Sequence, residues 1–483
     1  MPVLRRRELF GVLTAPFLLR AQAPRKPLNV VFFLTDDHGA WALNHAGCSE
    51  MLTPNIDRLA ATGARFTNAF AATPVCSPSR ATWLTGRLPS AHGIQDYVMS
   101  GGLGSQNDTV GPSAKRFLAG QPTFSESLAG AGYKVGLVGK WHMGDDVNPQ
   151  AGFTSWTTVP GAAGTYRDAV FSRNGKTEKT TGMKSDRLGD FAIEFLDQAK
   201  AEPFCLYMPF YAPHTPYDYQ SEEYRRPYEN SPFSCFPRVP VHPLRMTTLL
   251  GKPTATLKDH DNPQSMLAYS ALVTAADQNI GRVLKHLDKL GLRENTLVVF
   301  ASDQGHNSGH HGLWGKGNAT IPFNMYEESI RVPLIWNLPG RIPEGRVFPQ
   351  LVSSYDFMPT LLDYLGVTAP NDPRRVGQSY APLLRGQPYR QRDQVFFEYE
   401  YVRSVRTNRW KYVERADGWP SELFDLSQDP GEAKDVLGTT EGARIAAKLK
   451  KSLHAFFRKS GAPAADQWRT TTRQLLPTYG TDR

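Results

Sequence analysis

The stretch "LNVVFFLTDD", residues 28–37, is a continuous apolar run that ends in two adjacent aspartates. Such a run is typical of a strand that is buried on both faces, as in a parallel sheet covered by helices. In sheets of this kind, ligands bind outside the carboxyl ends of the strands. The stretch therefore predicts a central parallel strand, and it places Asp36 and Asp37 at the edge of the sheet where a site would form.

The same arrangement recurs along the chain, because strand-like runs alternate with helix-like segments such as 268–292. The runs that lead into polar residues are 133–139 (before Lys140 and His142), 203–216 (which carries His214) and 296–305 (which carries Asp303 and Gln304). A further strand is expected at 331–340. The alternation predicts an α/β fold with a large mixed, mostly parallel sheet sandwiched by helices.

The length of 483 residues suits one large domain and a smaller one. After about residue 370 the composition becomes polar and rich in Arg and Pro, which indicates a connector. Short strand-like pieces follow, with a turn at residues 407–408 and an amphipathic helix near 441–458. We expect a catalytic domain at 24–375 and, at 385–483, a C-terminal α+β subdomain with a small antiparallel sheet and a helix.

The first 23 residues resemble an export signal. Three arginines at 5–7 precede an apolar run at 9–19, and Ala21-Gln22-Ala23 fits a cleavage site. The apolar run is too short to cross a bilayer, and no later run is apolar enough to do so. Arg6-Arg7 favours a twin-arginine signal over an ordinary secretory one. We therefore predict an exported protein, periplasmic or secreted.

The net charge of +9 suits an anionic substrate and does not indicate nucleic acid as a partner. Cys48, Cys76, Cys205 and Cys235 show no CxxC spacing, which argues against a cysteine zinc site. If Cys76 is reserved for chemistry, at most one disulfide forms among the other three, and the pair stays open.

Asp36, Asp37, Asp303 and Gln304 follow two apolar strands and offer hard oxygen ligands. An aspartate pair at one strand end is more often a turn or a helix cap. When both pairs end strands of one sheet, their carboxylates repel one another unless a cation lies between them. Oxygen ligands of this kind predict Ca²⁺, with Mg²⁺ as the alternative.

The stretch "PVCSPSRATWLTGR", residues 74–87, places Cys76 before a candidate helix start. Pro78 suits the first turn of a helix, and Arg80 would then lie one turn beyond the cysteine. A small buried cysteine at a helix start would be the default for an isolated thiol.

The segment Cys76-Ser77-Pro78-Ser79-Arg80, followed by Thr85-Gly86-Arg87, resembles the signature of type I sulfatases, which have the alkaline phosphatase-like superfold. Other matches come in the family's order: Asp36-Asp37, Gly139-Lys140-Trp141-His142, Pro213-His214-Thr215-Pro216, Ser302-Asp303-Gln304-Gly305, and Lys316 in "LWGKG". Gln304 departs from the Asn of the best-known members, although it keeps a carbonyl oxygen.

The resemblance implies that a separate maturation enzyme oxidises Cys76 to Cα-formylglycine. One hydroxyl of its hydrate would attack sulfur, and ionisation of the second would expel sulfate and restore the aldehyde. The implied metal ligands are Asp36, Asp37, Asp303, Gln304 and the modified Cys76. The implied catalytic residues are Arg80 and Lys140 (holding charge), His142 (base), and Lys316 and His214 (binding sulfate and protonating the leaving alcohol).

The resemblance thus implies a sulfuric ester hydrolase that acts on a sulfated carbohydrate or aryl alcohol. Three alternatives stay open: a phosphoester or phosphonate monoester hydrolase of the same superfold, a non-catalytic exported glycan-binding protein, and an enzyme that uses the unmodified Cys76 thiol. Loops at 97–121, 150–185 and 217–262 are expected to shape specificity. Their tyrosines would stack on sugar rings or pack the loops, namely Tyr166, Tyr217, Tyr219 and Tyr224. A zinc site in "HNSGHH", 306–311, is given little weight.

Overall fold

A computed structural model describes residues 26–98, 114–162, 164–249, 252–416, 418–460 and 479–480. The predicted signal peptide at 1–23 and most of the 97–121 loop lie outside the described residues. Within the described part of the chain, no helix combines the length and the apolar character that a membrane span needs.

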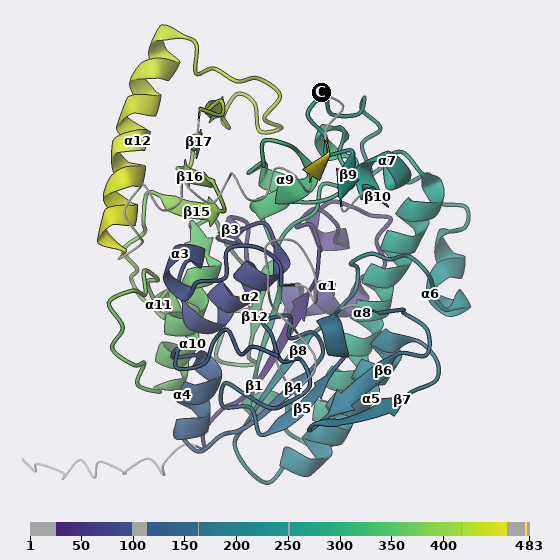
Figure 1. Cartoon of the computed structure of the whole chain (residues 1–483). Helices are drawn as coiled ribbons and strands as arrows, with labels where there is room; N and C mark the ends of the chain where they lie inside the picture. Colours follow the sequence, from purple (N-terminus) through teal and green to yellow (C-terminus); the bar gives the residue numbers. More distant parts are fainter. Residues whose placement is uncertain are drawn as a thin grey trace, which may run out of the picture.

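A ten-stranded sheet forms the centre of the molecule, in the order β13-β2-β12-β11-β1-β8-β4-β5-β6-β7 (Figure 1). Five neighbouring strands run parallel: β11 (Thr296–Ser302), β1 (Asn29–Thr35), β8 (Phe204–Pro209), β4 (Lys134–Val138) and β5 (Ser155–Thr158). On one side lie β12 (Leu334–Asn337), antiparallel to β11, then β2 (Ala64–Phe66) and β13 (Arg346–Phe348). The other edge is the hairpin of β6 (Val170–Arg173) and β7 (Lys176–Lys179). The predicted mixed, mostly parallel sheet is confirmed.

Helices cover both faces of this sheet, and β1 shows why its sequence is apolar throughout. Val31 and Phe33 belong to the core formed with α1 (Pro54–Ala61), α5 (Lys184–Ala199) and α8 (Pro263–Lys289). Phe32 and Leu34 belong to the core formed with α2 (Cys76–Thr85), α4 (Phe124–Gly130) and α10 (Phe357–Leu365). Successive side chains of a strand point to opposite faces, so a strand between two helical layers needs apolar residues at every position.

Shorter elements connect these layers. The one-turn helices are α3 (Pro89–His92), α6 (Glu222–Arg225), α7 (Ala255–Asp259), α9 (Glu327–Ile330) and α11 (Ala381–Leu384). The 3₁₀ turns are η1 (Asn44–Ala46), η2 (Pro160–Ala162), η3 (Arg226–Tyr228), η4 (Arg293–Asn295), η5 (His310–Gly312), η6 (Gly317–Ala319) and η7 (Ser354–Asp356). Small ladders join β3 (Ala69–Phe70) to β14 (Val352–Ser353), and β9 (Thr248–Leu249) to β10 (Lys252–Pro253) and β19 (Tyr479–Gly480).

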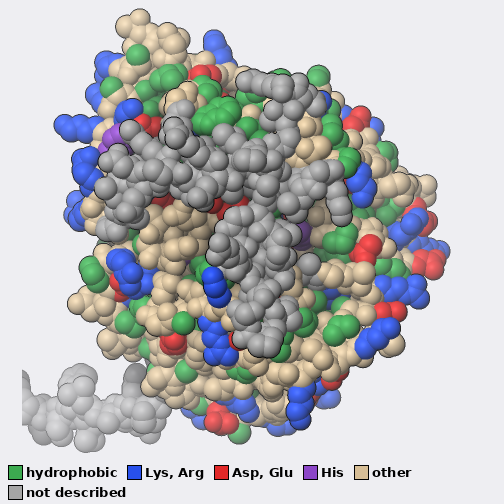
Figure 2. All heavy atoms as spheres, viewed as in Figure 1, with side chains coloured by type: hydrophobic (Ala, Val, Ile, Leu, Met, Phe, Trp, Pro, Cys, Tyr) green, Lys and Arg blue, Asp and Glu red, His purple; other side chains and the backbone are tan. Residues whose placement is uncertain are grey.

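The C-terminal part forms an antiparallel sheet with one long helix, as predicted. The sheet contains β15 (Val395–Tyr399), β16 (Val402–Arg406), β17 (Trp410–Arg415) and β18 (Glu422–Asp425). The helix α12 (Thr440–Lys459) buries Leu449, Leu453 and Phe457 against it. The opposite face of α12 is exposed and carries Lys448, Lys451 and Arg458, and Figure 2 shows basic side chains along that edge of the molecule. The alternation of buried and exposed positions explains why the sequence predicted this helix.

The expectation of a long loop at 150–185 is wrong. This stretch contains β5, β6 and β7, which widen the central sheet. The turn between β6 and β7 is Asn174-Gly175, and both residues have positive φ (49° and 87°). An Asn-Gly pair between two short strands is a strong hairpin indicator, because it fits the turn that matches the twist of the strands.

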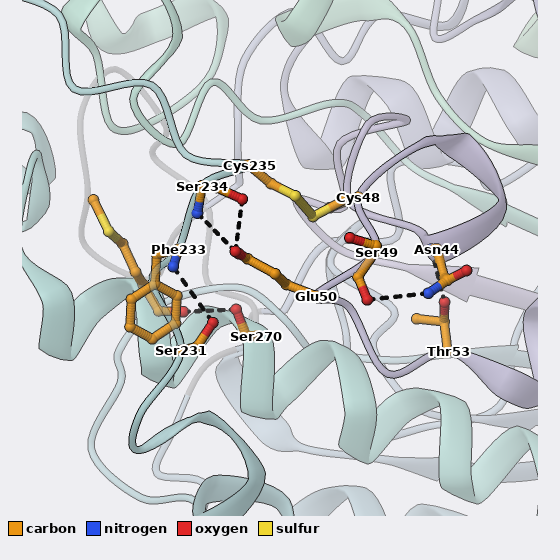
Figure 3. Close-up of a disulfide and its surroundings, with 12 residues drawn as sticks. Asn44, Cys48, Ser49, Glu50, Thr53, Ser231, Phe233, Ser234, Cys235 and Ser270 are labelled. Carbon is orange, nitrogen blue, oxygen red and sulfur yellow. Dashed lines mark hydrogen bonds between the residues drawn. A yellow bond between two sulfur atoms is a disulfide. The ribbon is translucent and has the colours of Figure 1, made fainter.

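A disulfide joins Cys48 to Cys235, with Cα atoms 5.6 Å apart, and it links segments that are separated by 187 residues (Figure 3). Beside it, the backbone N–H and the hydroxyl of Ser234 donate to Glu50 Oε1 over 2.9 and 2.6 Å. Cys76 and Cys205 are free and buried. The structure thus settles the pairing that the sequence left open, and the disulfide fastens the 217–262 segment to the loop after β1.

Removing this disulfide with Cys48→Ala and Cys235→Ala together is expected to lower the free energy of unfolding by about 2–5 kcal/mol, because a cross-link over a long loop restricts the unfolded chain. Urea titration under non-reducing conditions measures the change. Cys205→Ala is the matched control, since it removes a buried thiol without breaking a cross-link. A double variant as stable as the parent protein would contradict the prediction.

Candidate active site

Polar side chains from four parallel strands meet at the carboxyl edge of the central sheet. The register pairs Thr35 of β1 with Ser302 of β11, so the next residues, Asp36 and Asp303, lie side by side. The backbone N–H of Asp37 donates to Asp303 Oδ1 over 3.3 Å, which joins the two strand ends. Lys140 and His142 follow β4, and His214 follows β8. The sequence prediction that these residues share one edge is confirmed in their placement.

Two of these residues have an unusual backbone. Asp37 and His142 both have φ of 63°, in the left-handed region that residues other than glycine seldom occupy. Strained conformations of this kind cluster at functional sites, where the surrounding structure holds them in place.

Three buried carboxylates form the centre of the site. Asp36 and Asp303 are fully buried, and Asp37 is nearly so. Gln304 Nε2 donates to Asp36 Oδ1 over 3.2 Å and to Asp37 Oδ1 over 2.6 Å. The other amide atom, Oε1, is buried without a hydrogen-bond partner among the described residues. A flip of the amide exchanges its N and O, so Gln304 can present this oxygen beside the carboxylates. Three carboxylates and one amide oxygen fit a hard cation such as Ca²⁺ or Mg²⁺.

Three cationic side chains surround these acids. Lys140 Nζ lies 2.6 Å from Asp36 Oδ2, and Lys316 Nζ lies 2.7 Å from Asp37 Oδ1. The Arg80 guanidinium bridges Asp36 (3.2 Å) and Asp303 (2.7 Å). Each buried charge therefore has a partner of opposite sign, as low-polarity surroundings require.

Burial and the surrounding charges shift the pKa values of the three aspartates in different directions. Burial alone would raise the pKa of Asp36, but the surrounding cations, Lys140 foremost, together outweigh it and hold this pKa well below its ordinary value. For Asp37, burial is likewise outweighed, chiefly by Lys316, and the pKa falls to about 2. For Asp303, burial and then the neighbouring charge of Asp36 raise the pKa to about 7. The site therefore holds at least two ionised carboxylates at neutral pH.

Cys76 is the first residue of α2, and Pro78 stands in the first turn of that helix, as the sequence predicted. The thiol is buried, and Lys316 Nζ lies 3.7 Å from Sγ. Burial raises the pKa of this thiol above its ordinary value. Potential ligand atoms of Cys76, Asp36 and His214 lie within 4.8 Å of one another. The first residue of α2 thus faces the acidic centre.

His142 presents one ring nitrogen to a backbone carbonyl. Nε2 lies 2.9 Å from the Val98 oxygen, and since a carbonyl only accepts, Nε2 is the protonated nitrogen. Nδ1 is buried without a hydrogen-bond partner among the described residues. Burial also lowers the pKa of His142 well below its ordinary value. The ring is therefore neutral, with an acceptor nitrogen at Nδ1.

His214 is the most open of the predicted site residues, because 30% of its side chain is exposed. Its Nε2 lies 3.6 Å from Asp37 Oδ2. The Tyr166 hydroxyl donates to the backbone carbonyl of His214 over 2.9 Å, which fixes the segment that carries the histidine. Tyr166 is itself buried, so this tyrosine packs the loop and does not offer a stacking face.

Lys184 lies next to the candidate active site, and it was not identified from the sequence. Its Nζ donates to the Gly164 carbonyl over 2.9 Å and lies 4.4 Å from the centroid of the Tyr211 ring. Burial lowers its pKa to about 7. A lysine at the start of an amphipathic helix is normally an exposed surface residue. The sequence pattern therefore gave no reason to expect that Lys184 is buried.

The histidines of "HNSGHH" turn to separate partners. His306 Nδ1 lies 2.6 Å from Ser308 Oγ, and His311 Nε2 lies 2.8 Å from Glu328 Oε2. Nδ1 of His310 faces the backbone carbonyl of Asn307. Among the described residues, the three histidines do not form a common ligand group.

Buried acids and a helix-start cysteine meet at the carboxyl edge of a largely parallel sheet, and this arrangement is that of the alkaline phosphatase-like fold. A family model described as Sulfatase matches residues 28–367. A second model, described as N-sulphoglucosamine sulphohydrolase, C-terminal, matches residues 309–459. The chain belongs to the sulfatase family and is a sulfatase, an enzyme that hydrolyses sulfate esters.

Individual relatives agree over most of the chain. N-acetylglucosamine-6-O-sulfatase of Bacteroides thetaiotaomicron is 29% identical in an alignment that covers 88% of this chain and 85% of that protein. A solved structure described as a complex with its substrate, D-glucosamine-2-N,6-O-disulfate, superposes with a TM-score of 0.77 at 27% identity and covers 92% of this chain and 100% of that one. The phosphonate monoester hydrolase of Agrobacterium radiobacter reaches a TM-score of 0.70 at 22% identity, covering 90% of this chain and 96% of that one, and shows a shared fold alone.

Proposed function

We propose that this sulfatase cleaves the sulfate ester of a sulfated carbohydrate, with formylglycine made from Cys76 as the nucleophile precursor and Ca²⁺ as the metal. The observation that carries the proposal is the buried cluster of Asp36, Asp37 and Asp303 beside the Cys76 thiol and Lys316. The names of the relatives support a sulfated hexosamine as the substrate, while an aryl sulfate is the simpler alternative.

Asp36, Asp37, Asp303 and Gln304 would hold the cation, with Mg²⁺ as the alternative to Ca²⁺. When bound there, the cation would supply a Lewis acid that polarises an oxygen of the sulfate group. Arg80 would offset the charge of Asp36 and Asp303 and keep the two side chains aligned, and Lys140 would keep Asp36 ionised. The orphaned Oε1 of Gln304 supports its place in this ligand set.

The hydrate of formylglycine would supply one hydroxyl that attacks sulfur while the bond from sulfur to the leaving oxygen breaks. Ionisation of its second hydroxyl would then break the C–O bond to sulfate and restore the aldehyde. His142 is the proposed base, because its Nδ1 is free to accept a proton. Lys316, which lies between Asp37 and Cys76, would bind a sulfate oxygen. His214, the most open residue, would protonate the leaving alcohol.

The proposal also includes the export signal, the domain boundaries and the maturation of Cys76. We take residues 1–23 as a twin-arginine-like signal peptide, 24–375 as the catalytic domain and 385–483 as the C-terminal subdomain. The protein would be exported to the periplasm or beyond, and a formylglycine-generating enzyme would mature Cys76. Export suits an enzyme whose substrate is a glycan too large to enter the cell.

The function is tested with 4-nitrophenyl sulfate, 4-nitrophenyl phosphate and a 4-nitrophenyl phosphonate on the matured enzyme. We expect kcat/KM for the sulfate to exceed that of the other two by at least about a hundredfold, or about 3 kcal/mol of transition-state stabilisation. Cys76→Ala serves as the control for contaminating hydrolases. A preference for the phosphonate would instead indicate a phosphonate monoester hydrolase. This alternative is tested because such a hydrolase shares the fold.

A further inference from the structure

The loop from Gln304 to Lys316, named here the active-site loop, is fastened at both ends to the short helix α9. The backbone N–H of Gly305 donates to the Ser329 carbonyl over 3.0 Å. At the other end, Asn324 Nδ2 donates to the carbonyl of Lys316 over 3.1 Å, and the Ser329 hydroxyl donates to Asn324 Oδ1 over 2.8 Å. One residue of α9 is therefore linked to the backbone at each end of this loop.

The contact between α9 and the active-site loop is close. A Cβ atom at Gly305 would lie 2.0 Å from the Glu328 carbonyl oxygen, so glycine alone fits there. Near the middle of the loop, His311 Nε2 lies 2.8 Å from Glu328 Oε2, and the His311 ring stacks on the Tyr326 ring with centroids 3.8 Å apart. Because close-packed elements transmit displacements, a shift of α9 would move the backbone beside Gln304.

Charged side chains of the C-terminal sheet also hold α9, which lies beside this sheet (Figure 1). Lys411 Nζ on β17 lies 3.3 Å from Glu327 Oε1, and Arg406 on β16 lies 3.3 Å from Glu327 Oε2. Lys411 Nζ also donates to the Met325 carbonyl over 2.6 Å. Burial alone would raise the pKa of Glu327, but the cations around it, Lys411 foremost, outweigh burial and lower this pKa. Glu327 is therefore ionised at neutral pH, and its ion pairs tie α9 to the sheet.

Glu432, which follows β18, completes this arrangement. Its Oε2 accepts the backbone N–H of Glu327 over 2.7 Å, and its Oε1 pairs with Lys411. The Lys411 and Glu432 side chains are both fully buried, and buried charges are costly unless they are paired and hydrogen-bonded. Glu432 also has a φ of 52°, a strained value that persists only where the surrounding structure holds it. The start of α9 is thus locked to the C-terminal part of the chain.

We infer that Lys411 and Glu432 are positioning residues for catalysis: they hold α9, and α9 holds the loop from which Gln304 and Lys316 reach the acidic centre. The inference rests on the proposed roles of Gln304 and Lys316. It gives the C-terminal sheet a part in turnover that is separate from its part in stability.

The test compares Lys411→Met with the parent enzyme, both matured, on 4-nitrophenyl sulfate. We expect kcat per folded molecule to fall by about 10²-fold, the cost of misplacing a catalytic group by about 1 Å. The inhibition constant for inorganic sulfate should rise, because Lys316 would no longer be aligned with a sulfate oxygen. Amide hydrogen exchange in the active-site loop, followed by mass spectrometry, should become faster.

Arg403→Met is the matched control. Arg403 is also buried, lies on β16 of the same sheet and pairs with Glu398 at 2.7 Å. Glu398 in turn accepts the backbone N–H of Ser90 over 2.8 Å, so this pair joins the sheet to α3 and not to α9. The control should lower Tm as Lys411→Met does, while kcat, the inhibition constant for sulfate and the exchange of the active-site loop stay near the parent values.

Glu432→Gln is the second variant, which decides if Lys411→Met does not fold. It keeps an oxygen for the same backbone N–H and loses the ion pair, so the three readouts should change in the same direction by a smaller factor. Parent values in the folded variant, or changes equal to those of Arg403→Met, overturn the inference. If Lys316→Ala itself keeps parent turnover, the proposed role of Lys316 fails instead. Hydrogen exchange then judges the inference, and unchanged protection of the active-site loop overturns it.

Discussion

Replacing Cys76 by serine is expected to leave an enzyme that reacts with its substrate once and then stops. The serine hydroxyl can take the sulfuryl group: an O–S bond forms, the bond from sulfur to the leaving oxygen breaks, and the alcohol gains a proton. The carbon then carries no second hydroxyl whose ionisation could expel sulfate. Steady turnover should fall by at least roughly 10³-fold, or about 4 kcal/mol of activation free energy.

The measurement is the intact mass of the Cys76→Ser protein after exposure to substrate, together with the size of the product burst. One sulfuryl group per molecule and a burst equal to the enzyme concentration are expected. Cys76→Ala is the matched control and should show neither. In the parent enzyme, the peptide spanning residues 66–87 should be about 18 Da lighter than its cysteine form, as one oxidation of the thiol to an aldehyde requires. Multiple turnover by Cys76→Ser would refute the elimination step.

The central strands could be predicted because both faces of each are buried. A strand such as β1 must be apolar at every position, which leaves a run that stands out in the sequence, and the polar residues directly after it must then lie at the carboxyl edge. The grouping of Asp36 with Asp303 follows from that geometry. The C-terminal sheet could also be predicted from the sequence, because its strands are joined by short turns.

Features that depend on the finished fold could not be predicted. The strand β7 is fully exposed and reads "KTEK", so no hydrophobic pattern marks it. The Cys48–Cys235 pair spans 187 residues, and proximity over that distance is a product of the whole fold. The segment that carries His214 is held by a hydrogen bond from Tyr166 to the backbone carbonyl of His214. Because every residue has such a carbonyl, the sequence gives no sign of which one accepts this bond. Such contacts leave no mark in composition or spacing.

Asp303→Asn is expected to reduce turnover by at least about 10³-fold, more than the 10–100-fold that follows from losing a residue that only supports a metal ligand. The substitution keeps the size of the side chain and removes one of three buried carboxylates, so a divalent cation is held less tightly. It also leaves the Arg80 guanidinium with Asp36 as its remaining acidic partner in this cluster. Calcium content measured by mass spectrometry should fall, and the rise in Tm on adding Ca²⁺ should shrink.

Asp356→Asn provides the matched control for this variant. Asp356 is also fully buried and pairs with an arginine, Arg392, at 2.6 Å, but it lies outside the acidic cluster. Its replacement should lower stability, because a largely buried guanidinium without its acid is costly, while turnover per folded molecule stays near the parent value. Chelation should abolish turnover of the parent enzyme, and added Ca²⁺ should restore it far more readily there than in Asp303→Asn. If the parent enzyme still turns over substrate after exhaustive chelation, the prediction is wrong. The three carboxylates would then pair with the surrounding lysines and arginine and would not bind a metal.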